Sequence, residues 1–267
     1  MKFQNKFKYN LGMIFLLFLA LFIFSNSNTN AQINRPFNNC YQDVFQGCDS
    51  CTDSSLVTKT FPYMGCNVEV TYKMRHCNCP DPTTFVDLEF LRVSLTDCYN
   101  LVCWLHPGPD PCINNPLNID NYKLLEWAMY HALLDDLFNT DYPNYICPNT
   151  IKYKYYFPGQ CNHICYYQVT GTNGGGVLYM TEECPGSIGC CGMEFTYCKQ
   201  ENGPIIKYWD SFNEPSTCSE TIIPYPTCYY NVNDPITIGG NTWYVTLVFT
   251  TACIPDCKEV HGSNQEF

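Results

Sequence analysis

The chain has 267 residues and a formal net charge of −11, and 20 of its residues are cysteine. Hydrophobic residues make up 46% of the chain and charged residues only 15%, which excludes an intrinsically disordered protein. The 25 acidic against 14 basic side chains argue against a nucleic-acid-binding protein, because such proteins neutralise phosphates with basic residues. The composition favours an exported globular protein held together by disulfides.

Residues 1–31 have the pattern of a secretory signal peptide. Three lysines precede an apolar run of 14 residues from Leu11 to Phe24, and a small, polar stretch ends at Ala31. A membrane-spanning helix needs about 20 apolar residues, so we favour cleavage after Ala31 over an uncleaved membrane anchor. Cleavage removes the three lysines and no acidic residue, which takes the net charge from −11 to −14. We therefore expect a secreted protein, extracellular, periplasmic or on the cell surface, with no membrane span after signal cleavage.

All the cysteines follow the signal peptide, and in an oxidising compartment paired thiols persist as disulfides. Their number is even, which allows every one of them to be bridged, but the sequence does not determine which cysteine pairs with which. We predict disulfides at Cys40, Cys48, Cys51, Cys66, Cys77, Cys79, Cys98, Cys103, Cys112, Cys147, Cys161, Cys165, Cys184, Cys190, Cys191, Cys198, Cys218, Cys228, Cys253 and Cys257.

Residues 32–116 are predicted to be a β-rich, cysteine-rich half. Within Cys66–Tyr72, three apolar residues alternate with polar ones, which is typical of a half-buried strand. A second strand is predicted over Thr84–Leu95. Four prolines between Pro107 and Pro116 then indicate a long loop.

Residues 117–139 are predicted to be a central amphipathic helix. Asp120–Phe138 contains no Gly or Pro, and its apolar residues recur at spacings of three and four. Asn118 or Asp120 is a suitable N-cap, and Asn139 a suitable end. Apolar residues occupy more than half of the circumference, which predicts a helix packed between sheets.

Residues 140–267 are predicted to be a second β-rich, cysteine-rich half. Its clearest strand is Asn241–Thr251, which is rich in β-branched and aromatic residues and follows a Gly-Gly-Asn turn. The glycines of Thr172–Gly176 predict a hairpin turn between strands at 165–170 and 176–181. Cys191–Tyr197 shares four of seven residues with Cys66–Tyr72, which suggests a weak internal repeat or a chance likeness of two strand patterns. The sequence leaves open whether the two halves form one domain or two.

No catalytic motif is present in the sequence. A nucleophile elbow, a His-Glu-x-x-His zinc motif and a phosphate-binding loop are all missing. Cys161–Cys165 encloses His163 and could bind zinc, but disulfides are favoured after export. Cys48 and Cys51 have the spacing of a redox pair, although the polar run after them favours structural bridges.

Acidic residues offer further sites, each with a plainer interpretation. Asp135–Asp136 and Glu182–Glu183 could supply the two carboxylates of a glycosidase, but such doublets are usually solvated. His131 and Asp135 lie one helical turn apart, either as a metal or acid–base pair or as an ordinary surface pair. The Asn- and Asp-rich stretch 110–121 suits calcium but matches no known calcium loop. We assign no catalytic residue, no metal site and no cofactor, and the binding residues stay unknown.

The 21 tyrosines include clusters in which alternate side chains should point outward from strands. Exposed tyrosine rings suit adhesive or sugar-stacking surfaces, and the alternative is that they cover disulfides and strand edges. These clustered tyrosines are Tyr153, Tyr155, Tyr156, Tyr166, Tyr167, Tyr229 and Tyr230.

The strand Cys66–Tyr72, the central helix and the segment Cys190–Cys198 together resemble uncharacterised cysteine-rich exported bacterial proteins. This resemblance implies no activity, ligand or site residue. We expect a mainly β (α+β) fold of disulfide-rich antiparallel sheets with one central amphipathic helix.

The function predicted from the sequence is that of a secreted or cell-surface structural or adhesive binding protein. Its partner would be a glycan, a matrix protein or a further copy of the chain, and not a nucleic acid. Two alternatives stay open, an extracellular hydrolase whose site is assembled from distant carboxylates and a subunit of a surface appendage.

Overall fold

The structure of the protein is a computed structural model. It describes residues 51–78, 83–157, 161–172, 174–184, 191–213 and 226–255. The predicted signal peptide lies outside the described residues, and so do six of the predicted disulfide cysteines, Cys40, Cys48, Cys79, Cys190, Cys218 and Cys257. Among the helices in the described ranges, none has both the length and the apolar character that a membrane crossing requires.

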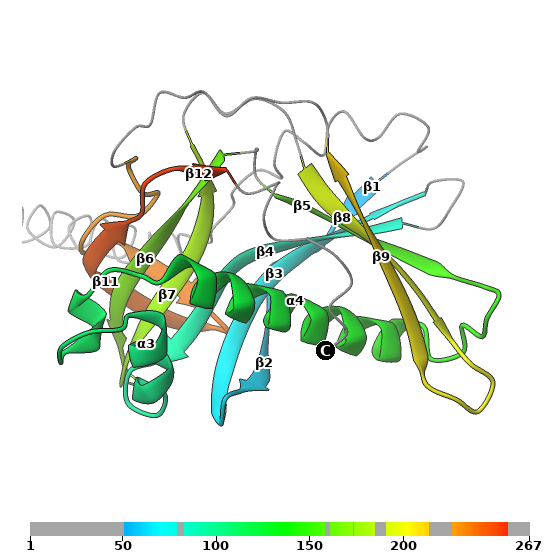
Figure 1. Cartoon of the computed structure of the whole chain (residues 1–267), viewed down its shortest axis with the longest axis horizontal. Helices are drawn as coiled ribbons and strands as arrows, with labels where there is room; N and C mark the ends of the chain where they lie inside the picture. The colour runs from blue at the N-terminus through cyan, green and yellow to red at the C-terminus, as the bar shows by residue number, and fades with distance from the viewer. Residues whose placement is uncertain are drawn as a thin grey trace, which may run out of the picture. The chain divides into compact units, whose positions relative to one another are not determined.

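One 12-stranded sheet forms the body of the described chain (Figure 1). Its strands are β1 (Cys51–Asp53), β2 (Val57–Tyr63), β3 (Cys66–Cys77), β4 (Thr83–Ser94), β5 (Ile151–Phe157), β6 (Cys161–Gly171), β7 (Gly174–Glu183), β8 (Cys191–Lys199), β9 (Ile205–Asn213), β10 (Pro235–Ile238), β11 (Asn241–Thr250) and β12 (Ile254–Pro255). The helical elements are α3 (Tyr99–Leu105), a short 3-10 helix η1 (Cys112–Asn114) and α4 (Ile119–Asp141).

The sheet is mostly antiparallel, and its main path runs β10-β11-β6-β7-β4-β5-β8-β9. Outside this path, β3 pairs with β4, β1 and β2 pair with β3, and β12 pairs with β6. The prediction of a mainly β fold with disulfide-rich antiparallel strands and a central helix is confirmed. The predicted hairpin around residues 172–176 is also present, as the connection between β6 and β7.

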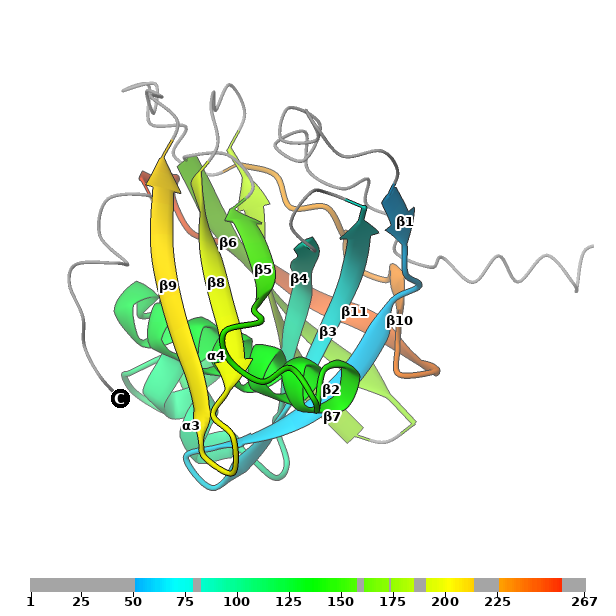
Figure 2. The same ribbon diagram turned by 90° about the vertical axis from the view of Figure 1, so that its right-hand side faces the viewer.

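Strand β4 joins the two predicted halves of the chain (Figure 2). One of its edges pairs with β3 along nearly its whole length. The other edge is divided, because residues 83–85 pair in parallel with β5 and residues 91–94 pair antiparallel with β7. Strands from residues 32–116 and from residues 140–267 therefore share one sheet.

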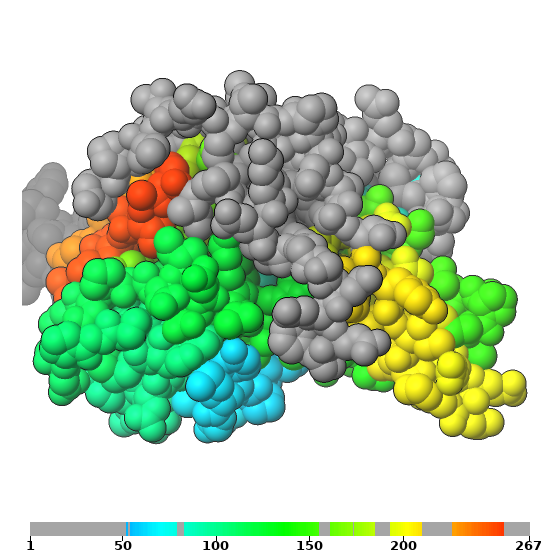
Figure 3. Space-filling view, viewed as in Figure 1, coloured from blue at the N-terminus to red at the C-terminus, as the bar shows by residue number. Residues whose placement is uncertain are grey.

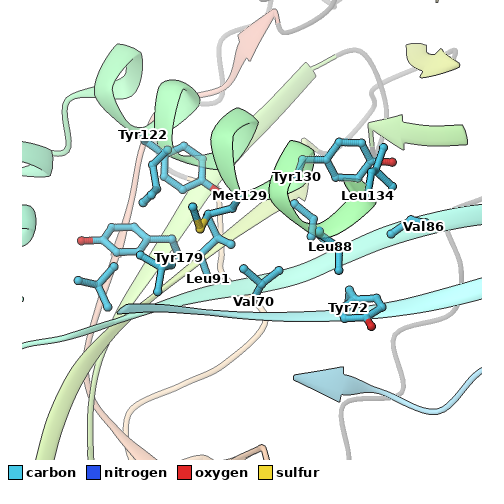
Figure 4. Close-up of a cluster of buried hydrophobic side chains, with 14 of the residues drawn as sticks. Val70, Tyr72, Val86, Leu88, Leu91, Tyr122, Met129, Tyr130, Leu134 and Tyr179 are labelled. Carbon is cyan, nitrogen blue, oxygen red and sulfur yellow. The ribbon is translucent and has the colours of Figure 1, made fainter. Parts of the chain in front are cut away.

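Helix α4 covers one face of this sheet (Figure 4). Val70 and Leu91 project from β3 and β4 towards Met129 and Tyr130 of the helix, and all four side chains are buried. The helix has eight buried residues, which are Tyr122, Leu125, Met129, Tyr130, Leu133, Leu134, Leu137 and Phe138. The expectation that the helix packs between sheets is wrong, since its rings reach β7, β8 and β9 of the same sheet.

The sequence placed the helix correctly but missed its neighbour. α4 extends two residues beyond Asn139, to Asp141. Its N-cap is Asn118, as predicted, and the Asn118 side chain accepts a hydrogen bond from the backbone N–H of Asn121. The seven-residue helix α3 was not predicted. It is tied to η1 by the disulfide Cys103–Cys112.

The opposite face of the sheet is also buried along β4, β6 and β11. Phe85 and Phe90 of β4, Tyr167 of β6 and Trp243 of β11 are each at most 2% exposed and lie outside the helix-facing cluster. Because side chains alternate along a strand, a strand with both faces covered buries consecutive residues. Tyr166 and Tyr167 of β6 are buried in this way, so the expectation that one of them points to solvent is wrong.

Disulfides connect the strands to the segments beside them. Besides Cys103–Cys112, the structure contains Cys147–Cys198, Cys165–Cys228 and Cys184–Cys253. Cys77 and Cys161 are also disulfide-bonded. Cys66 and Cys98 are buried free thiols.

Candidate functional site

Two polar residues from separate sequence motifs meet beneath the surface of the sheet. His163 on β6 lies opposite Glu182 on β7, and its Nε2 atom is 3.8 Å from the Oε2 atom of Glu182. Cys165 lies two residues further along β6 and therefore on the same face, with its Sγ atom 3.7 Å from the same Nε2. We call His163, Cys165, Tyr167 and Glu182 the His163 cluster. His163 is 1% exposed and Glu182 is 9% exposed.

The carboxylate of Glu182 is held from two directions. The Tyr167 hydroxyl donates a hydrogen bond of 2.9 Å to Oε1, and the backbone N–H of Tyr229 approaches the same oxygen at 3.3 Å. Burial, together with this carboxylate, raises the pKa of Tyr167, so its phenol stays protonated and remains a donor. Glu182 therefore ties the hairpin of β6 and β7 to the segment that precedes β10.

His163 is neutral at neutral pH. Burial lowers the pKa of its imidazole to about 4, because the interior solvates the charged form poorly. A separation of 3.8 Å from Glu182 is also too long for a hydrogen bond. The Nδ1 atom of His163 is buried and has no hydrogen-bond partner among the described residues. The contact with Glu182 is therefore not an ion pair at pH 7.

The donor atoms of the His163 cluster are close enough together to consider a metal ion. One atom each of His163, Cys165 and Glu182 lies within 4.8 Å of the other two. However, Cys165 forms a disulfide with Cys228, and a zinc site requires the thiolate form of cysteine. With this disulfide formed, the cluster offers one imidazole and one carboxylate, which are fewer ligands than zinc sites use.

A second buried polar group lies on the side of β3 and β4 that faces away from α4. Nζ of Lys73 is 2.5 Å from a Glu89 oxygen, and Nη1 of Arg92 is 2.5 Å from a Glu69 oxygen. The Arg92 guanidinium also lies 3.8 Å from the ring centre of Trp243 on β11. Each cation is thus matched by an anion or an aromatic face, which favours a structural role. The strand patterns gave no signal that this charged group would be buried.

The two members of the helix pair that the sequence suggested make different contacts in the structure. Asp135 accepts a hydrogen bond from the Tyr197 hydroxyl and pairs with Lys207 at 3.0 Å. His131 packs against Trp127 and Trp209 instead. The two residues thus anchor α4 to β8 and β9 by different contacts.

The Asn- and Asp-rich stretch 110–121 is used for local hydrogen bonds. The side chains of Asn115 and Asn121 donate to the backbone carbonyls of Pro109 and Trp104, and that of Asn118 caps α4. Asp110 accepts from the Tyr99 hydroxyl. These oxygens and amides stabilise the turns around α3 rather than converge on one point.

The clustered tyrosines divide into buried and exposed residues. Tyr153, Tyr166, Tyr167 and Tyr230 are buried. Tyr229 is 55% exposed, and the side chains of Tyr155 and Tyr156 lie outside what the structure describes. Most of these tyrosines therefore belong to the core, where edge-on ring contacts such as Tyr153 with Tyr197 are common.

A β-bulge places two exposed hydrophobic residues of β11 side by side on one face. Tyr244 pairs with Thr170 of β6, and Leu247 pairs with Gln168, because the register shifts by one residue between Val245 and Leu247. Tyr244 is 51% exposed and Leu247 is 42% exposed. We call Tyr244, Leu247 and the exposed Thr170 the β11 patch.

The surface of β11 is visible beside helices α3 and α4 in the space-filling view (Figure 3). Seven large hydrophobic residues are exposed in the described chain, and four of them fall within residues 229–247. The β11 patch supplies two of these, and Tyr229 and Val232 supply the others. Exposed apolar residues are thus concentrated in one short part of the sequence.

Comparison of the chain with protein-family models, with curated proteins and with solved structures finds no match.

Proposed function

We propose that the protein is a secreted or cell-surface binding protein, stabilised by disulfides, that uses the β11 patch to hold a glycan or a matrix protein. The observation that carries this proposal is the β-bulge, which brings Tyr244 and Leu247 to the same exposed face. A tyrosine ring offers a stiff apolar surface for stacking and a hydroxyl for hydrogen bonding. The neighbouring Thr170 supplies a further hydroxyl.

The β11 patch is held rigidly by the surrounding structure, which favours ligand binding. The disulfide Cys165–Cys228 holds the segment before β10 onto β6, and Cys184–Cys253 holds the chain just after β11. The backbone of Asn233 also donates to the carbonyl of Val245, beside the bulge. A surface fixed in this way loses little conformational entropy when a ligand binds.

Arrays of glycans and matrix proteins, probed with the purified protein, test this function. Tyr244→Ala and Leu247→Ala should each weaken binding at least several-fold without changing the thermal unfolding midpoint by more than a few degrees. Tyr208→Ala is the matched control, because Tyr208 is 65% exposed on β9 and lies outside the patch. Equal loss of binding in the Tyr208 variant, or turnover of any glycan or peptide, would count against the proposal.

A further inference from the structure

Two free thiols meet where the sheet adjoins the first helix. Cys66 is the first residue of β3, and Cys98 directly precedes α3. Both side chains belong to the same buried hydrophobic cluster. They are separated by β4 in the sequence, so their contact joins the sheet to the helical layer.

The two sulfur atoms are direct neighbours. The Cys98 thiol forms a side-chain hydrogen bond with the thiol of Cys66, and it also accepts a hydrogen bond from the backbone N–H of Asn67. Leu101 and Val102 of α3 and Val68 of β3 are buried in the same cluster. The one group of possible metal ligands in the described residues does not include either cysteine. An apolar setting with two thiols in contact is suited to a disulfide and poorly suited to a metal ion.

We propose that Cys66 and Cys98 form a disulfide in the oxidised protein, which fastens β3 to α3. Formation of the S–S bond removes two protons and two electrons from the thiols. The electrons pass by thiol–disulfide exchange to an external disulfide, such as oxidised glutathione or an oxidoreductase, which is reduced to two thiols.

This bridge has a structural role that the four assigned disulfides do not fill. Cys103–Cys112 lies within the helical layer, and the other three lie within residues 147–253. Cys66–Cys98 would connect the N-terminal strands to the helical layer covalently. The proposal is independent of ligand binding at the β11 patch.

The surroundings of the pair also indicate when the bridge forms. Burial and the neighbouring Cys66 thiol raise the pKa of Cys98 to about 11. The thiolate is the species that attacks a disulfide, so the Cys98 thiol of the folded protein is a poor nucleophile near neutral pH. Because both thiols are also buried, we expect the bridge to form before the core around them closes.

Thiol counting on the denatured protein tests the pairing without any substitution. The chain is refolded in a redox buffer of reduced and oxidised glutathione, denatured at acidic pH and labelled with N-ethylmaleimide without reduction. We expect no label on Cys66 or Cys98, and a disulfide-linked peptide pair that contains both after proteolysis. Labelling of both cysteines, or linkage of either one to another cysteine, would overturn the proposal.

Single substitutions provide the matched controls. Cys66→Ser should release one labelled thiol at Cys98, and Cys98→Ser should release one at Cys66. Cys103→Ser should instead expose Cys112 and leave the Cys66–Cys98 peptide pair intact, since that disulfide is separate. If Cys66→Ser left Cys98 unlabelled, another cysteine would be its partner and the assignment would be wrong.

Discussion

At the scale of single residues, His163 shows how burial alone sets a charge state. The imidazole lies beside a carboxylate, an arrangement that would raise its pKa at the surface. Burial has the larger effect and lowers the pKa to about 4. Glu182 instead receives its hydrogen bonds from Tyr167 and Tyr229. The folded state is therefore stable with a neutral His163 imidazole, and protonation of this imidazole destabilises it.

Acid should therefore destabilise the fold through His163. Its pKa is about 4 in the folded state and about 6.5 in the unfolded state, so the unfolded chain binds more protons between these values. The stability that neutral His163 contributes to the fold is fully present above pH 6.5 and is lost as the pH falls towards 4. The shift corresponds to roughly 3 kcal/mol at most. Thermal unfolding of wild type and His163→Leu at pH 7 and pH 4.5 measures the difference.

The wild type should lose more stability than His163→Leu over this interval. His106 is also buried with a lowered pKa and contributes in the same direction in both proteins, so only the difference between them reports on His163. His76→Leu is a control, because His76 is an exposed residue of β3. An identical pH dependence in wild type and His163→Leu would show that protonation of His163 does not limit acid stability.

The sequence predicted the hairpin that carries His163 and Glu182 but not their pairing. The glycines after Thr172 indicate the turn, but the predicted strand ends at 170 and 176 would place residue 163 opposite residue 183, whereas the structure closes the turn with Gly171 opposite Gly174 and so pairs residue 163 with residue 182. The pairing of Lys73 with Glu89 was not predictable either. Lys73 and Glu89 lie on the face of β3 and β4 that points away from α4. That face is buried in part by β11, whose Trp243 packs on Arg92, and β11 is distant from both strands in the sequence.

At the scale of elements, β3 and β8 use equivalent residues in equivalent ways. Val70 and Phe195 are buried towards α4, and so are Tyr72 and Tyr197. Glu69 and Glu194 occupy matching positions and pair with basic residues of neighbouring strands, Arg92 for the first and Lys152 and Lys154 for the second. The likeness of the two segments in sequence thus extends to their environment, although the repeat itself stays a prediction.

Capping at the start of α4 should contribute measurably to stability. The Asn118 side chain accepts a hydrogen bond of 3.1 Å from the backbone N–H of Asn121. Asn118→Ala removes it and should cost about 1 kcal/mol, or about 2–4 °C in the unfolding midpoint. Urea unfolding followed by circular dichroism measures the free energy of unfolding.

Asn139→Ala is the comparison for the capping prediction. Asn139 lies near the other end of α4, where its exposed side chain donates to the carbonyl of Asp135. Alanine has a higher helix propensity there, so stability should change by only a few tenths of a kcal/mol. Equal losses of unfolding free energy in the two variants would indicate that the Asn118 cap contributes no more to stability than the Asn139 hydrogen bond.

The two helices differ in how far the sequence determines them. α4 was predictable because its apolar residues recur over 23 residues with a cap at the start. α3 has seven residues, which is too short for a periodic pattern, and an isolated helix of this length is unstable. Its packing on the sheet and the disulfide Cys103–Cys112 stabilise it, and neither is visible in the sequence.

At the scale of the whole molecule, disulfides should decide whether the chain is folded. Each closed loop contributes about 2–4 kcal/mol, while a domain's net stability is about 5–15 kcal/mol. Complete reduction of the unfolded chain, followed by removal of the denaturant with the reductant present, should leave it largely unfolded. Far- and near-ultraviolet circular dichroism measure the secondary and tertiary structure that the reduced chain retains. A reduced chain with a native-like cooperative transition would show that packing alone suffices.

The pairing of strands across the halves was beyond sequence reasoning. Periodicity identifies strands but not their neighbours, and β4 pairs with β5 and β7, which follow it by more than 50 residues. Contacts so distant in sequence leave no local pattern. The sequence accordingly left open one domain or two.

This shared strand predicts that neither half folds without the other. A chain ending at residue 116 would expose the edge of β4 that β5 and β7 cover, together with the apolar side chains that α4 buries. A chain starting at residue 140 would lack β4, which lies between β7 and β5. Unpaired edges and uncovered apolar faces favour aggregation over folding. We expect the separately refolded halves to show broad, poorly dispersed amide NMR spectra, and a chain that contains both halves and α4 to show dispersed ones. A dispersed spectrum from either half alone would establish an independent domain, and the shared β4 would then be a docking contact rather than a requirement for folding.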